Sequence, residues 1–211
     1  MNKKVSILLA LIAIFMLLLG CALHPVAKYY ILDYTPALDT SFFQYTFPYK
    51  VQVKEFDIMD AYDQPRIVVR RSAHEIYYDR LSLWAIRPQV AISSLLIKHI
   101  NSINLFEQCK KTFLDERPDY VISGTIYNIE KYESEHITRA DIHIVLTMTE
   151  VATNNVILTY EILQYIPIYN SNMDYFAKKI SDTLHSEFNA FLKEVNKYFV
   201  AQRDISPKRK E

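Results

Sequence analysis

The chain of 211 residues carries 24 Lys and Arg side chains against 24 Asp and Glu, so its formal net charge is zero. Because 50% of its residues are hydrophobic, it suits one packed globular domain rather than a disordered chain. The charge balance argues against a nucleic-acid-binding protein, since such proteins carry a basic excess. The only glycines are Gly20 and Gly124, which excludes the glycine-rich phosphate loops of Walker-type and dinucleotide-type sites.

The first twenty residues have the layout of a secretory signal. Lys3 and Lys4 precede an uncharged apolar stretch from Val5 to Leu19, which ends at Gly20-Cys21. A stretch of this length is short for spanning about 30 Å of hydrocarbon. We therefore expect residues 1–20 to be a cleaved signal peptide, with an uncleaved membrane anchor as the alternative.

Leu18-Leu19-Gly20-Cys21 resembles the lipobox of bacterial lipoproteins. The resemblance implies that the Cys21 thiol receives a diacylglycerol, that the chain is cut before Cys21, and that the new N-terminus is acylated with a chain such as palmitate. Each buried methylene contributes about 0.8 kcal/mol, so two or three chains hold a protein on a bilayer. Residues 21–27 then form a lipidated tether.

Signal cleavage removes Lys3 and Lys4 and no acidic residue, which gives the mature chain a net charge of −2. With Cys21 lipidated, Cys109 has no other cysteine with which to form an intramolecular disulfide. No His lies near Cys109 in the sequence, so we expect an apolar filler rather than a nucleophile.

Strand patterns dominate the first part of the mature chain. Lys28 to Asp33 is rich in aromatic and branched residues, and Tyr49 to Asp57 mostly alternates apolar with polar ones. Arg66 to Arg71 and Glu75 to Tyr78 have the same character. The short Ser72-Ala73-His74 link between them predicts a hairpin.

An amphipathic helix is predicted over Pro88 to Ser102. Proline suits the first helical position, and apolar residues recur after it at helical spacing. His99 lies on or near the buried stripe, where a structural histidine is more common than a base.

Three longer strands follow, at Tyr120 to Tyr132, Arg139 to Val151 and Val156 to Ile166. In the middle strand the apolar residues share one face; they are Ile142, Ile144, Leu146 and Met148. Thr153-Asn154-Asn155 favours a turn, because Asn tolerates a positive φ. The turn predicts an antiparallel hairpin between the two flanking strands.

A final helix is predicted over Asn172 to Val200, with one apolar stripe that we expect to cover the sheet rather than bind a partner. Residues 28–200 therefore predict a single α+β domain, with a mainly antiparallel sheet of about five to six strands covered by two amphipathic helices. The polar residues 201–211 end in a basic cluster and are expected to be a disordered tail.

The sequence offers no convincing catalytic or metal-binding pattern. The 6 His have neither the i, i+4 spacing of a zinc hydrolase nor a Cys pair, and a Gly-x-Ser-x-Gly elbow is impossible. Glu75, Asp79, Glu130 and Glu133 are expected to solvate exposed strands rather than act as a glycosidase pair. We expect no enzyme activity, cofactor or metal.

Other features favour binding. The 16 Tyr and 11 Phe exceed what a small core needs and suit protein or lipid contacts. Arg66, Arg70 and Arg71 form a basic edge that suits a carboxylate or a phospholipid headgroup, although arginines also guard a strand against edge pairing. Trp84 is the only Trp, and we expect it to anchor the core rather than to be a binding hot spot for a partner.

Several runs resemble the PqiC/YmbA-like family of ABC-type transport auxiliary lipoproteins. The most specific are Tyr62-Asp63-Gln64-Pro65-Arg66-Ile67-Val68-Val69-Arg70, Tyr77-Tyr78-Asp79 and Leu83-Trp84-Ala85. Tyr29-Tyr30-Ile31-Leu32 is similar to the opening strand of that family. Pro118-Asp119-Tyr120-Val121-Ile122-Ser123-Gly124-Thr125-Ile126 is similar to its strand after the first helix.

The resemblance covers most of residues 28–200. It implies a periplasm-facing lipoprotein that accompanies an MCE-domain protein and an ABC permease and ATPase, and helps to move phospholipid or another lipid across a Gram-negative envelope. Several family members form rings, so a homo-oligomeric ring is implied as well. Ala22 stands where Asp would signal inner-membrane retention, which favours the outer membrane, with the inner membrane as the alternative.

We therefore expect a non-enzymatic docking or collar subunit with no nucleic-acid partner. Its candidate partner-contact residues are Arg66, Arg70, Tyr77, Tyr78 and Trp84. The alternative is a structural or assembly lipoprotein that serves an outer-membrane barrel or a secretion complex. An envelope hydrolase is the third option.

Overall fold

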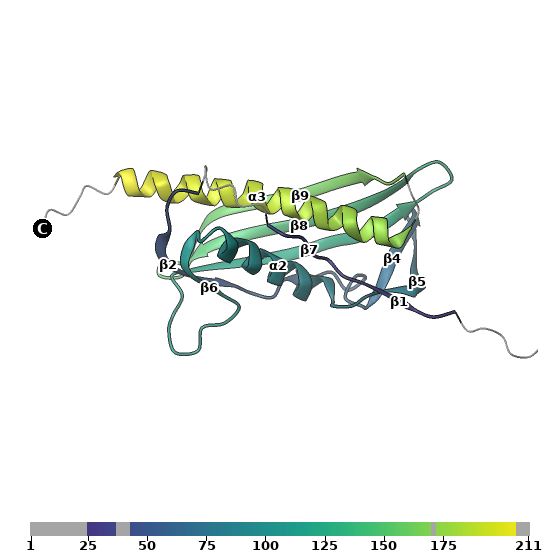
Figure 1. Cartoon of the computed structure of the whole chain (residues 1–211), viewed down its shortest axis with the longest axis horizontal. Helices are drawn as coiled ribbons and strands as arrows, with labels where there is room; N and C mark the ends of the chain where they lie inside the picture. The colour runs from purple at the N-terminus through teal and green to yellow at the C-terminus, as the bar shows by residue number, and fades with distance from the viewer. Residues whose placement is uncertain (1–24, 37–42, 170–171, 206–211) are drawn as a thin grey trace, which may run out of the picture.

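The computed structural model of the protein describes residues 25–36, 43–169 and 172–205 (Figure 1). The predicted signal peptide, Cys21 and the end of the tail lie outside these residues. The described elements are β1 (Lys28–Tyr30), β2 (Phe47–Val53), β3 (Asp57–Ile58), β4 (Arg66–Ser72), β5 (Glu75–Trp84), α2 (Pro88–Ser102), β6 (Phe106–Lys110), β7 (Tyr120–Glu133), β8 (Thr138–Glu150), β9 (Asn155–Pro167) and α3 (Met173–Ile205).

All nine strands belong to one mixed sheet organised around β7. One edge of β7 pairs antiparallel with β8 along its length, and β8 pairs antiparallel with β9. The other edge of β7 pairs in parallel with β2, β3 and β4 in succession. β4 and β5 form the predicted hairpin, β1 runs parallel to β5, and β6 runs parallel to β2.

The α+β class is confirmed, but the sheet is larger than predicted and mixed rather than mainly antiparallel. β3 has only two residues and β6 only five, which is too short for a periodic pattern to mark them. Parallel pairing joins strands that are far apart in the sequence, so no short turn motif between them predicts the pairing.

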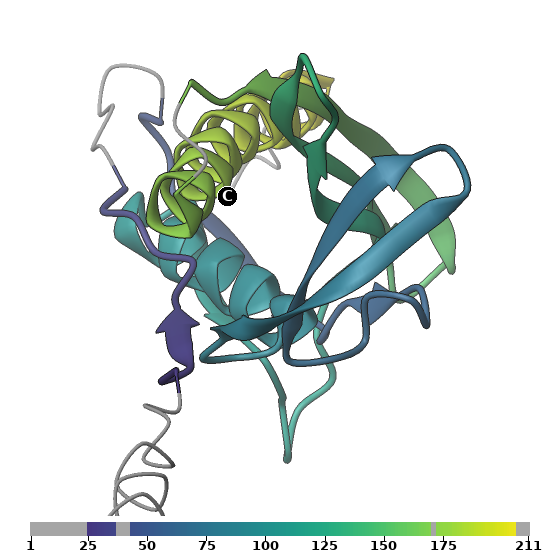
Figure 2. The same ribbon diagram turned by 90° about the vertical axis from the view of Figure 1, so that its right-hand side faces the viewer.

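The sheet curves around the two helices, which lie on its concave side (Figure 2). The predicted apolar face of β8 points inward, because Ile142, Ile144, Leu146 and Met148 are fully buried. The predicted stripe of α3 is buried as well, with exposures of 0–1%; its members are Phe176, Ile180, Leu184, Phe188, Phe191 and Val195. The stripe therefore covers the sheet, as expected.

α3 runs the length of the domain (Figure 1). Near its start Phe176 packs on Trp84, with ring centroids 5.9 Å apart, and near its end Phe199 packs on Tyr49 and Tyr120. Its 33 residues span about 50 Å. The helix continues five residues beyond the predicted end at Val200. Arg203 in this extension lies over the Tyr45 ring, 4.3 Å from its centroid.

Cys109 on β6 is a free thiol that is only 4% exposed. Burial raises the pKa of this thiol to about 12, so it is almost entirely protonated near neutral pH. The expected role as an apolar filler is confirmed.

Gly124 on β7 is needed because the Phe56 ring lies very close to its backbone. A Cβ added there would lie 2.8 Å from carbons of the Phe56 ring, closer than side chains pack. Phe56 is 3% exposed and lies between β2 and β3, so the missing side chain at Gly124 leaves room for the Phe56 ring against β7.

We expect Gly124→Ala to lower the free energy of unfolding by about 1–3 kcal/mol, because the new methyl group overpacks against Phe56. Urea unfolding followed by the fluorescence of Trp84 measures it. Ser123→Ala, at the adjacent β7 position, is the control and should change stability by about 0.5 kcal/mol or less. In a Phe56→Leu background the cost of Gly124→Ala should shrink; an undiminished cost would show that Phe56 is not the cause.

Candidate functional site

The segment that follows β1 is fastened to both helices. Leu32 and Tyr34 are buried. The Lys98 ammonium of α2 donates to the Asp33 carboxylate (2.7 Å) and to the carbonyl oxygen of Tyr34 (2.9 Å). The Asp33 N–H donates to the Ser181 hydroxyl of α3 (3.2 Å). We call residues 31–36 the N-terminal strap, since they bind the start of the domain to its helical layer.

A buried histidine completes the attachment of the strap. The Tyr34 hydroxyl lies 3.0 Å from His99 Nδ1, and His99 Nε2 lies 3.2 Å from Asn189 Oδ1. Because an amide oxygen only accepts, Nε2 carries the proton and Nδ1 accepts from Tyr34. The Tyr34 ring also stacks on His185, with centroids 4.9 Å apart. Burial, assisted by His185, lowers the pKa of His99 to about 4. His99 is fully buried and both ring nitrogens have partners, as expected for a structural histidine.

The convex face of the sheet holds a buried ion pair. Glu130 on β7 is 2% exposed and accepts from the Arg70 Nε (2.5 Å) and from the Tyr62 hydroxyl (2.7 Å). Arg70 Nη2 also donates to the Tyr62 oxygen (3.2 Å). Burial and the bond to Glu130 raise the pKa of Tyr62 to about 12. The expectation that Glu130 solvates an exposed strand is therefore wrong, because a loop and a neighbouring strand cover it.

A second arginine–carboxylate pair lies beside the first. Asp141 on β8 is the direct cross-strand neighbour of Glu130 and accepts two bonds from Arg139, at 2.7 and 3.1 Å. Burial raises the pKa of Asp141, and Arg139 opposes this shift. The Arg139 guanidinium also lies over the rings of Tyr132 (4.2 Å) and Tyr165 (5.0 Å). Both arginines are bonded to buried carboxylates. Arg70 links β4 to β7 through Glu130, whereas the Arg139–Asp141 pair lies within β8 and reaches the neighbouring strands through the two tyrosine rings.

The five candidate contact residues do not form one surface. Trp84 is 4% exposed and packs under α3, so the favoured role as a core anchor is confirmed and the side chain presents little surface to a partner. Arg70 is bonded to Glu130. Tyr77 is half-buried, with its hydroxyl 3.5 Å from a Glu133 oxygen. Arg66 and Tyr78 are exposed.

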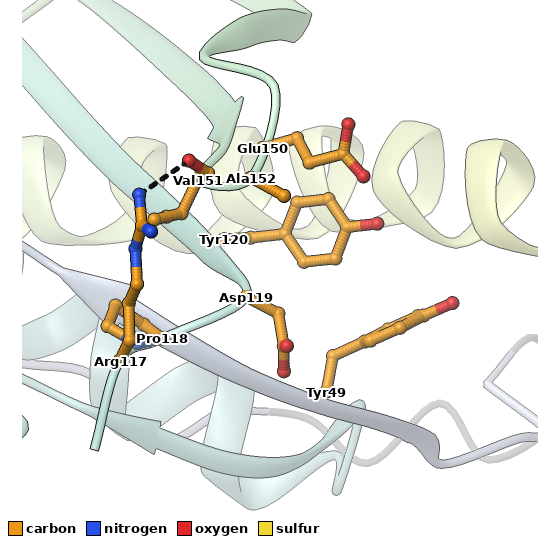
Figure 3. Close-up of a pocket in the computed structure, with 8 residues that line it drawn as sticks. All are labelled: Tyr49, Arg117, Pro118, Asp119, Tyr120, Glu150, Val151 and Ala152. Atoms are coloured by element: carbon orange, nitrogen blue, oxygen red, sulfur yellow. Dashed lines mark hydrogen bonds between the residues drawn. The ribbon is translucent and has the colours of Figure 1, made fainter.

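A pocket of about 230 Å³ lies at the other end of the domain, near the end of α3 (Figure 3). Its lining residues are Tyr49, Arg117, Pro118, Asp119, Tyr120, Glu150, Val151 and Ala152. The Tyr49 and Tyr120 rings are 5.1 Å apart and nearly perpendicular (80°). Both rings pack against Phe199, so α3 fixes their positions.

The polar groups of the pocket are held by the backbone and by a turn. Arg117 donates to the Val151 carbonyl oxygen (3.0 Å), as Figure 3 shows. The Asp119 carboxylate accepts the Lys50 N–H (2.7 Å), and Glu150 accepts the Thr153 hydroxyl (2.6 Å). Two aromatic rings beside two carboxylates suit a cationic group such as a Lys or Arg side chain.

This pocket was not predicted from the sequence. Pro118-Asp119-Tyr120 indicates only the start of a strand. Tyr49 and Glu150 reach the site because β2 and β8 flank β7 on opposite edges. Only the sheet order brings them together, so no local pattern marks the pocket.

Neither helix of the described residues has the length and the continuous apolar character needed to cross a bilayer. In the same residues no cluster of three or more His, Cys, Asp and Glu side chains is arranged to hold a metal ion.

No family model and no curated protein matches the sequence. Among solved structures, the protein is similar to XCC0632 from Xanthomonas campestris, a protein of the DUF330 family, with a TM-score of 0.68 and 14% identity over 85% of this chain and 98% of that chain. It is also similar to an uncharacterized protein, with a TM-score of 0.64 and 11% identity over 81% and 99% of the two chains. DUF330 is the family that the sequence resemblance indicated, and these matches support that family by fold.

We expect Glu130→Ala to cost about 3 kcal/mol of stability, because it leaves Arg70 and Tyr62 without their shared acceptor at a buried site. Chemical denaturation measures the loss. Asp182→Ala is the control, since Asp182 pairs with Lys178 on the exposed face of α3, and it should leave the unfolding midpoint within error. Equal losses in the two variants would contradict a bracing role for the network.

Stability should fall as the pH falls from about 6.5 to about 4. In this window the unfolded His99 binds a proton that the folded His99, with its pKa near 4, excludes. The loss from this group is at most about 3 kcal/mol. Urea unfolding at pH 7, 6 and 5 measures the slope, which His99→Gln should flatten and the exposed His136→Gln should not. An unchanged slope in His99→Gln would assign the effect to another group.

Proposed function

We propose that the protein is a non-enzymatic, lipid-anchored docking subunit of an MCE/ABC-type system that moves lipid between two membranes. The observation that carries the proposal is the fold likeness over 98% of the XCC0632 chain, in the family that the sequence resemblance indicated. An MCE-domain protein and an ABC permease and ATPase are the proposed partners, and the outer membrane is the proposed anchoring membrane.

The two ends of the domain suit different roles. Pro25 lies four residues after Cys21, and four extended residues reach at most about 14 Å. A lipid on Cys21 would therefore keep the β1 end close to the bilayer. α3 leads from that end to the pocket, whose tyrosine rings pack on Phe199 about 40 Å along the helix from Met173 (Figure 1). This polarity supports a role in which the pocket end meets a partner.

The pocket supports contact with a basic partner side chain. The half-buried Tyr49 ring and the Tyr120 ring, of which 8% is exposed, lie beside the pocket, and Asp119 and Glu150 offer compensating charge. No bond is made or broken in such a contact. The proposed task is to position a partner at a fixed distance from the membrane.

Affinity purification of the tagged full-length protein from detergent-solubilised envelopes tests the proposal, with mass spectrometry of the bound proteins. We expect an MCE-domain protein and its ABC subunits to be recovered. Glu150→Lys should reduce their recovery by about tenfold or more, because it places a cation where the partner's cation docks.

Glu75→Lys is the matched control, because Glu75 is an exposed carboxylate on the β4–β5 hairpin, away from the pocket. It should leave recovery unchanged, and both variants should keep the melting temperature of the wild type. Recovery of barrel or secretion components in place of MCE proteins would overturn the transport role and favour the assembly alternative. Equal losses in the two variants would overturn docking at the pocket.

A further inference from the structure

Several turns of the chain meet at one end of the domain. The strand pairings place the β4–β5 turn, the β7–β8 turn and the last residues of β9 at the same end of β7. The purple segment before β1 reaches this end of the long axis (Figure 1), and Figure 2 looks onto it. We call it the anchor end, because Pro25 follows Cys21 by four residues.

Two large apolar side chains are exposed at the anchor end. Ile137 in the β7–β8 turn is 52% exposed, and Tyr169 just after β9 is 92% exposed. The Ile168 N–H donates to the Thr138 carbonyl oxygen (2.9 Å), so the β8–β9 register continues past Pro167 and sets Ile137 opposite Tyr169. Ile168 is 5% exposed and fastens this segment to the core. We call Ile137 and Tyr169 the tip pair.

The backbone of the β7–β8 turn is bonded within the turn. The Ser134 N–H donates to the Ile137 carbonyl oxygen (2.9 Å), and the Ile137 N–H donates to the Ser134 hydroxyl (3.3 Å). Backbone groups with internal partners leave water at a lower cost than groups that depend on water for their hydrogen bonds. Ile137 can therefore enter a less polar environment without losing backbone hydrogen bonds.

Charge gives the anchor end no attraction to anionic lipid. The segments 25–28, 71–75, 133–137 and 167–169 contain two cationic and three acidic side chains, a net charge of −1 (2 minus 3); they are Lys28, Arg71, Glu75, Glu133 and Glu135. Attraction to an anionic bilayer needs a basic excess. Contact with lipid at this end would thus depend on the apolar tip pair.

We propose that the tip pair inserts into the headgroup layer of the membrane that holds the lipid on Cys21. The inference rests on the lipid anchor of the proposed function and adds a second contact to it. Four extended residues reach at most about 14 Å, which keeps the anchor end at the bilayer. The headgroup layer is about 5–8 Å deep on each side, within reach of an exposed turn. Tyrosine suits this layer, because its ring is apolar and its hydroxyl stays hydrated.

The second contact fixes orientation as well as distance. A lipid on Cys21 alone limits how far the domain moves from the bilayer, but it leaves the domain free to tilt. Contact through the tip pair selects the orientations in which the anchor end faces the lipid. Because α3 runs along the long axis, the pocket is then held away from the bilayer, on the side where a partner approaches (Figure 1).

Fluorescence of the full-length lipidated protein in phosphatidylcholine vesicles tests the insertion. Ile137→Cys and Tyr169→Cys each carry an NBD probe, which the buried Cys109 does not take up. In both variants we expect the emission to shift to shorter wavelength and to be quenched by spin-labelled phosphatidylcholine. Leu114→Cys is the matched control, because Leu114 is 90% exposed in the link between β6 and the other end of β7. Its probe should report water.

A charge in the tip pair tests the cause of the shift. Tyr169→Asp should abolish most of the shift of the probe at position 137, because a carboxylate opposes entry into the headgroup layer. Val156→Asp is the control, at a valine that is 58% exposed near the start of β9, and it should keep the shift. Both variants should keep the melting temperature of the wild type. Added phosphatidylglycerol, an anionic lipid, should change nothing.

Unshifted probes on protein that floats with the vesicles would overturn the insertion and leave the lipid anchor intact. A shift without quenching would assign the tip pair to another copy of the protein, and a shift that requires phosphatidylglycerol would assign it to charge. Either result, or a shift that Tyr169→Asp leaves unchanged, would overturn the inference. Protein that does not float would overturn the anchor and the inference together. Shifted probes without recovery of an MCE-domain protein would overturn the transport role alone.

Discussion

The fold depends on β7 having different neighbours along one edge and a single neighbour along the other. β2, β3 and β4 each pair with only two or three residues of β7, so none of them is a stable strand pair by itself. The ladder with β8 runs along the whole of β7, with one bulge between Ile126 and Asn128, and holds β7 in place for all three in turn. Gly124 and Glu130 lie on this strand, one facing the link between β2 and β3 and the other facing Arg70 of β4.

The two faces of this sheet are stabilised by different interactions. The concave face is apolar and buried by α2 and α3, which is the ordinary arrangement of an α+β layer. The convex face near β4 and β8 instead buries two carboxylates, each paired with an arginine. Buried ion pairs give little net stability but are costly to break. Because Arg70 lies on β4 and Glu130 on β7, their pair favours one register of β4 along β7 over shifted alternatives.

Elements with long, regular patterns were predicted well. Helix α2 begins at Pro88 and ends at Ser102 as expected, and Asn154 has the positive φ of 57° that its turn role requires. The burial of Ile144 and Phe188 followed from periods of 2 and 3.6 residues. Patterns of this kind report one element and the side that faces the core.

Features that depend on sheet order were not predictable. The parallel partners of β7 are distant in the sequence, and the burial of Glu130 results from Tyr62 and Arg70, which approach from other elements. The pocket between Tyr49 and Glu150 has the same origin. The resemblance named a family of the observed fold, but Arg70 and Trp84, which carried that resemblance, serve internal packing rather than an exposed contact.

The strap also determines how the domain bears mechanical load. β1 lies parallel to β5, and the strap continues across α2 and α3 through Asp33 and Tyr34. If Cys21 carries the lipid, a pull between membrane and partner acts along β1 and loads its hydrogen bonds with β5 in shear. Bonds loaded in shear must break together, whereas bonds that are peeled break one by one. The strap then transmits the remaining force to both helices, so the domain resists traction from its anchor as a single body.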